Sequence, residues 1–114
     1  MEVMEAIRGR RAVRSYTQTQ VTTEVVKRLV DAAIQAPSAI NAQPWHFTII
    51  RNQASLDRIS HAAKAHMLRA TATDGPMREH LEDPHFQIFY HAPALILISA
   101  RDVDWACEDS ALAA

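Results

Sequence analysis

Glycine is scarce in this sequence. Only Gly9 and Gly75 occur in 114 residues, whereas a chain of average composition has about eight. The phosphate-binding patterns GxGxxG and GxxxxGK[ST] need closely spaced glycines, so neither can be written anywhere in the chain. If the protein binds a phosphate group, side chains must hold it instead of a glycine loop. Arginine is the side chain best matched to that task.

Cysteine and long apolar runs are also lacking. Cys107 is the single cysteine, which excludes an internal disulfide and is typical of a reducing compartment. The first 14 residues have no apolar core of a signal peptide, and there is no stretch of about 18 apolar residues that could span a membrane. With 48% hydrophobic residues and a net charge of −1, we expect one cytoplasmic domain over 1–114 without affinity for nucleic acid or membranes.

Hydrophobic periodicity predicts the secondary structure. An apolar stripe at helical spacing predicts a core-facing helix over about 23–36, capped by Thr22 or Thr23; the stripe consists of Val26, Leu29, Val30, Ala33 and Ile34. Other helices are expected over 2–9, 55–68 with Ser55 as the cap, and 105–114, with a loop or broken helix over 71–83 and a helical turn over 86–91. Strands are expected over 46–51 and 94–100, the second buried on both faces because it is continuously apolar.

Four arginines fall within the seven positions 8–14. The guanidinium group is planar, always charged and matched to phosphate oxygens, so this segment is a candidate clamp for a phosphate or an anionic ring. A solvated basic surface is the plainer interpretation. Binding of nucleic acid is a third possibility, which the near-neutral chain makes weak.

The segment 36–45 contains two prolines, a serine, two carboxamides and a tryptophan, and no charge. Pro37 ends the preceding helix and Pro44 keeps the exit extended. The amides of Asn41 and Gln43, each with two donors and an acceptor, suit the edge of a flat heterocycle. An ordinary loop with an Asx turn at Asn41 is the alternative.

Metal and nucleophile chemistry find little support. The six histidines do not make the i, i+4 pair of the HExxH zinc motif, and no cysteine joins them. Ser38 has no base near it in the sequence. We therefore expect neither a metal site nor a catalytic side chain.

Taken together, the segments 10–16 and 36–47, at their observed spacing, resemble the nitroreductase family of FMN-dependent oxidoreductases, and 89–98 and 108–114 resemble later segments of it. The resemblance implies an α+β fold with a mostly antiparallel sheet flanked by helices. It also implies an intimate homodimer with FMN at each end of the interface. By analogy, Arg10, Arg11 and Ala12 hold the FMN phosphate and ribityl chain, and Arg14 lies near the pyrimidine edge. The FMN of the neighbouring subunit is reached by the loop residues Pro37, Ser38, Ala39 and Asn41. Gln43 supports this loop.

The resemblance further implies that hydride passes from NAD(P)H through FMN to a nitroaromatic, a quinone or a similar small acceptor, with the flavin supplying the chemistry. Two departures stand out. Ala12 replaces the usual serine, and family members are longer, so the chain is expected to correspond to their N-terminal portion, with the C-terminal part absent. The alternatives are another flavin reaction on the same fold, such as dehalogenation or flavin destruction, and a non-enzymatic module that binds anions.

Overall fold

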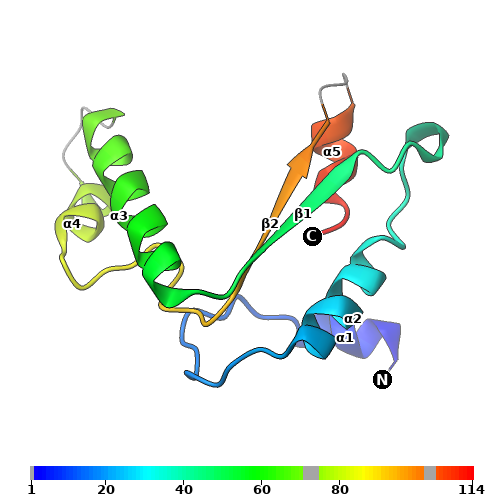
Figure 1. The fold of residues 1–114 in the computed structure, drawn as a ribbon, viewed down its shortest axis with the longest axis horizontal. Coiled ribbons are helices and arrows are strands. Elements are labelled where there is room, and N and C mark those ends of the chain that lie inside the picture. Colours follow the sequence, from blue (N-terminus) through cyan, green and yellow to red (C-terminus); the bar gives the residue numbers. More distant parts are fainter. Residues whose placement is uncertain (1, 71–74, 102–104) are drawn as a thin grey trace.

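A two-stranded antiparallel ribbon forms the centre of the molecule (Figure 1). The computed structural model describes residues 2–70, 75–101 and 105–114. Strand β1 (Trp45–Ile50) pairs with β2 (Leu95–Ala100), in a register that places Phe47 opposite Ile98. The strands expected over 46–51 and 94–100 are therefore confirmed to within one residue at each end.

The two faces of this ribbon have different surroundings. Phe47, Ile96 and Ile98 share a cavity with residues of helix α2 (Thr23–Ala33) and the C-terminal end of the chain, so this face points inward. Leu97 points to the opposite face and is 50% exposed. The expectation that the second strand is buried on both faces was therefore wrong. Its apolar run is continuous, but the described residues cover one face only.

Helix α2 (Thr23–Ala33) begins where the sequence predicts. The Thr22 hydroxyl accepts a hydrogen bond from the Val25 N–H at 3.3 Å, which satisfies one of the free donors of the first turn. The helix ends about three residues before the predicted position. Val26 is buried but Leu29 is 51% exposed, so the predicted stripe is not wholly a core face. Periodicity identified the apolar side of the helix correctly and overestimated how far that side is buried.

Helix α1 (Val3–Gly9) confirms the helix expected at the start of the chain, and all its residues are exposed. Helix α3 (Gln53–Ala70) starts two residues before the predicted cap. The Asn52 side chain accepts a hydrogen bond from the Ser55 N–H at 2.9 Å, so Asn52 caps the helix and Ser55 lies inside it.

Helix α4 (Pro76–Glu82) occupies part of the stretch expected as a loop or broken helix, whose residues 71–74 lie outside the described ones. Pro76 stands at the first helical position, where its missing N–H costs nothing. Helices α3 and α4 together form an arm on one side of the ribbon (Figure 1). The segment 86–91 that follows contains hydrogen-bonded turns instead of a helix.

Helix α5 (Ala106–Ala111) packs against β2 and is shorter than the expected 105–114. None of the helices within the described ranges is both long and apolar enough to cross a membrane. The radius of gyration is 16.7 Å, whereas a compact chain of this length has about 13 Å. The molecule is thus open, with its helices spread around the ribbon instead of closing over it (Figure 1).

Candidate functional site

The arginine segment continues from the end of α1 as chain that forms neither helix nor strand. Arg10, Arg11 and Arg14 are all exposed. The Arg11 guanidinium folds back so that its Nη1 donates to the carbonyl oxygens of Arg8 (2.7 Å) and Arg10 (2.8 Å). These contacts satisfy carbonyls at the C-terminal end of α1, where a cation is also favoured by the helix dipole. Arg11 therefore has a structural role besides the predicted phosphate contact.

Arg14 lies at the edge of a cavity of about 320 Å³. One wall is the segment Arg14, Ser15 and Tyr16, and the other comes from a turn far away in the sequence, with His85, Phe86, Gln87, Tyr90 and His91. The cavity thus combines a permanent positive charge, aromatic rings and imidazoles. Such a lining suits a flat, partly anionic ring system. Sequence reasoning identified Arg14 but missed the opposite wall.

The far wall is held in shape by the buried amide of Gln87, which is 6% exposed. Its Oε1 accepts hydrogen bonds from the backbone N–H groups of Phe89 (3.0 Å) and His91 (2.9 Å), and its Nε2 donates to Asp57 Oδ1 (3.0 Å). Tyr90 and His91 have φ angles of 53° and 55°, a left-handed conformation that non-glycine residues seldom adopt. Gln87 therefore stabilises a strained turn beside Arg14.

Further contacts tie this turn to α3. Lys64 Nζ donates to the carbonyl oxygens of Asp83 (2.6 Å) and Phe86 (2.7 Å), and the Ser60 hydroxyl accepts from the Ile88 N–H at 3.0 Å. The turn is thus joined to α3 by hydrogen bonds, and the same turn lines the cavity beside Arg14.

Asp57 on α3 has a pKa below its ordinary value. The chief cause is the hydrogen bond from Gln87, followed by the one from Gln53, and the nearby imidazole of His91 adds a smaller electrostatic contribution. Each of these favours the ionised carboxylate over the neutral acid. Asp57 is therefore a charged acceptor that orients the Gln87 amide, and that amide holds the turn beside Arg14.

The proline-bracketed loop contains the short 3₁₀ turn η1 (Ala39–Asn41). Three of its residues, Ile40, Asn41 and Gln43, have positive φ angles of 49°, 54° and 46°. The Ser38 hydroxyl accepts a hydrogen bond from the Gln43 N–H at 2.9 Å and so closes the loop on itself. A hydrogen-bonded corner lies where the sequence predicts one, with Pro44 buried at its exit.

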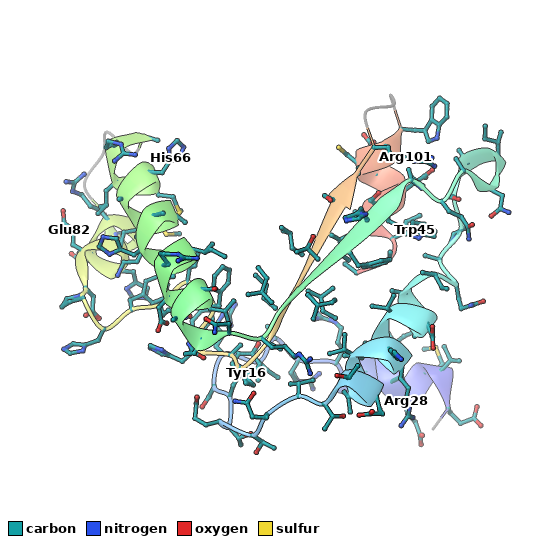
Figure 2. All side chains as sticks on the ribbon, viewed as in Figure 1. Tyr16, Arg28, Trp45, His66, Glu82 and Arg101 are labelled. Atoms are coloured by element: carbon teal, nitrogen blue, oxygen red, sulfur yellow. The ribbon has the colours of Figure 1, made fainter. Side chains whose placement is uncertain are left out.

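The loop and the arginine segment do not come together within one chain. Figure 2 shows Tyr16 at one end of the ribbon and Trp45 and Arg101 at the other end. The structure thus brings Arg14 to the turn 85–91 and separates it from the loop 37–43. Among the described residues, no group of three or more histidine, cysteine, aspartate or glutamate side chains is arranged to hold a metal ion.

Residues 7–114 match the model of the nitroreductase family, and the chain belongs to that family. It is 38% identical over 76 residues to nitroreductase NfnB of Mycolicibacterium smegmatis, covering 66% of this chain and 32% of that protein. Among solved structures, a nitroreductase with bound FMN from Bacteroides fragilis superposes with a TM-score of 0.84 at 32% identity, covering 99% of this chain and 60% of the other. An FMN-dependent nitroreductase from Clostridium difficile gives 0.82 at 30% identity, with coverages of 96% and 50%.

These comparisons confirm the expected family and its α+β fold. They also show how much of the length of its relatives this chain matches. The matched segments span 39%, 35% and 32% of the lengths of three curated relatives. The activity, substrates and partners of the protein are accordingly proposed below on the basis of the site itself.

Proposed function

We propose that this chain contributes to an FMN-dependent oxidoreductase that passes hydride from NAD(P)H to a nitroaromatic, a quinone or a similar acceptor. The observation that carries the proposal is the cavity beside Arg14, with a permanent cation on one wall and aromatic and imidazole rings on the other. Membership in the nitroreductase family supports the same reaction class, and two similar solved proteins are described as binding or depending on FMN. When bound, FMN supplies the redox chemistry.

The residues present fit this cofactor. In this proposal Arg14 faces the pyrimidine edge of the ring, where a guanidinium would stabilise the negative charge that reduction brings. Arg10 and Arg11 precede it on exposed chain suited to the phosphate. Arg11 keeps donors on Nε and Nη2 for that contact, because its two carbonyl bonds use Nη1. Ala12 offers its backbone N–H alone, since it lacks the hydroxyl of the usual serine.

A homodimer completes the proposed site. Tyr16, which shares the cavity of Arg14, and Trp45, which follows the loop, lie at opposite ends of the ribbon (Figure 2). The loop residues Pro37, Ser38, Ala39, Asn41 and Gln43 are not among the residues that line this cavity. In the proposed dimer they approach the flavin held by the partner subunit. Pro37, Ser38, Ala39 and Asn41 would then border the flavin, and Gln43 would support the loop.

The surface of the chain supports this assembly. Its accessible area is 8854 Å², whereas a folded monomer of 114 residues has about 6,300 Å². The difference, about 2,600 Å², lies in the range that each chain of a large obligate homodimer can bury. Apolar side chains contribute to the excess: Val3 and Ile7 on α1, Leu29 on α2 and Ile40 in the loop are all exposed.

The test combines ligand binding with size. The 114-residue chain is titrated into FMN while flavin fluorescence is followed, and its mass is measured by sedimentation equilibrium with and without FMN. We expect quenched fluorescence, a yellow protein and a dimeric mass. Oxidation of NADH and of NADPH is then measured with a nitroarene and with a quinone. A monomer that leaves FMN fluorescence unchanged contradicts the proposal.

Arg14→Ala tests the cavity directly. Removal of the guanidinium is expected to weaken FMN binding by about tenfold or more, because hydrogen bonds to charged groups are among the stronger ones in proteins. Arg28→Ala is the matched control, since Arg28 is an exposed arginine on α2. Equal FMN affinity of the two variants would remove Arg14 from the site.

A further inference from the structure

We propose that Asp109, on helix α5, is a positioning residue that sets the conformation of the loop 38–43. The inference rests on the proposed function, because its consequence for flavin binding requires the loop to border the cofactor. It is carried by a contact between parts of the chain that lie 70 positions apart: Asp109 Oδ2 accepts a hydrogen bond from the Ala39 N–H at 2.8 Å.

The loop needs such an anchor because its backbone is strained. Ile40 has a φ angle of 49°, and a β-branched residue in the left-handed region is a genuine outlier, since its side chain crowds the backbone. Ile40 is also 89% exposed, so packing of its own side chain does not offset the strain. Strained residues of this kind persist only where surrounding contacts define their conformation.

Two backbone hydrogen bonds lie within the loop, from the Asn41 N–H to the Ser38 carbonyl and from the Ala42 N–H to the Ala39 carbonyl. Three further bonds, made by side chains, add to this definition. The Ser38 hydroxyl accepts from the Gln43 N–H within the loop. The other two come from outside it: Asp109 holds the Ala39 N–H, and the Arg101 guanidinium donates to the Ala42 carbonyl. A carboxylate that accepts from a backbone N–H makes one of the stronger hydrogen bonds.

Both external anchors engage the loop backbone and make no use of the two amide side chains of the loop. Asn41 and Gln43 are exposed, and neither side chain takes part in the bonds made by Asp109 or Arg101. The loop can therefore present these amides to a ligand in a conformation set beforehand. Preorganisation of this kind raises affinity by reducing the ordering required on binding.

Hydrogen exchange of the 114-residue chain tests the anchor by itself. In Asp109→Ala, the Ala39 amide is expected to exchange about tenfold faster than in the unmodified chain, the low end for loss of a bond to a charged acceptor. Asp109→Asn keeps an acceptor oxygen and should give a smaller change. Glu108→Ala, at an exposed position of the same helix, should leave the rate unchanged. An unchanged Ala39 rate in Asp109→Ala overturns the proposal, as does equal acceleration of amides throughout the chain.

FMN titration of the same three variants tests the consequence for the ligand. We expect the dissociation constant to rise severalfold in Asp109→Ala, to be partly rescued in Asp109→Asn and to stay constant in Glu108→Ala. Faster loop exchange without a change in FMN affinity overturns the role in flavin binding. Absence of FMN binding by the unmodified chain contradicts the proposed function instead, and the exchange rates then decide alone whether Asp109 positions the loop.

Discussion

Replacement of Gln87 by leucine is expected to lower the free energy of unfolding by about 2 kcal/mol. The buried amide serves two backbone N–H groups and one carboxylate. A buried donor left without a partner costs about 1–3 kcal/mol. Phe89 is half-buried, so loss of the partner of its N–H should cost an amount of free energy within that range. His91 is exposed, so water can partly replace the hydrogen bond to its N–H. Asp57 is exposed and can exchange its lost donor for water.

Urea denaturation followed by circular dichroism at pH 7 provides the measurement. Gln53→Leu is the matched control, because Gln53 makes one hydrogen bond to the same carboxylate, at 3.1 Å. Loss of that single solvent-accessible bond should cost no more than about 0.5 kcal/mol. If both leucine variants unfold at the same urea concentration with equal slopes, Gln87 does not stabilise the turn and the reasoning fails.

Gln87→Glu tests the direction in which the stability of the protein changes with pH. The new carboxylate can still accept from both backbone N–H groups, but it faces Asp57 Oδ1 at the distance now spanned by a 3.0 Å hydrogen bond. Repulsion between like charges raises the pKa of the introduced acid above its unfolded value of about 4.3. Its destabilisation therefore appears as the pH rises through about 4.3 and increases until the folded-state pKa is passed. A variant whose stability relative to the unmodified chain does not change over that range contradicts the assigned contact.

Three further changes follow from single contacts and are measured by urea unfolding. Thr22→Ala removes the cap of α2 and should cost about 1 kcal/mol, whereas Thr22→Ser should be nearly neutral. Leu56→Ala opens a cavity at a fully buried site and should cost about 2–5 kcal/mol, and Leu112→Ala, at an exposed site, provides the comparison. The depressed pKa of Asp57 stabilises the fold above the unfolded value of about 3.9, and this contribution is lost as the pH falls through the folded-state pKa. Asp57→Asn should flatten that acid response, and an unaltered pH profile would show that the carboxylate is not coupled to folding.

Local patterns in the sequence predicted the elements of this fold better than their surroundings. The cap and apolar stripe of α2, and the composition of β1 and β2, located those elements within a few residues. Leu29 and Leu97 were nevertheless expected to be buried and are half exposed. Periodicity shows which side of an element is apolar, but it contains no information about what covers that side.

The site shows the same division between local and distant information. Arg14 could be singled out because arginines cluster along the sequence. The opposite wall of its cavity could not, because the turn at Tyr90 and His91 depends on Gln87 and on the side chains of α3 some 30 positions away. The assignment of cofactor contacts to Arg14, to the other arginines and to the loop residues stays a prediction, which FMN titration of single variants can test.

The pairing of β1 with β2 has a consequence for how the chain folds. Ile50 faces Leu95 and Trp45 faces Ala100, so the partners are 45 to 55 positions apart. The chain must close a long loop before the first of these pairs forms. This closure lowers the conformational entropy of the chain, and contacts between neighbours in the sequence do not offset that loss. We therefore expect the helices of the arm to form early and the pairing of β1 with β2 to form late, so that refolding is slow for a protein of this size.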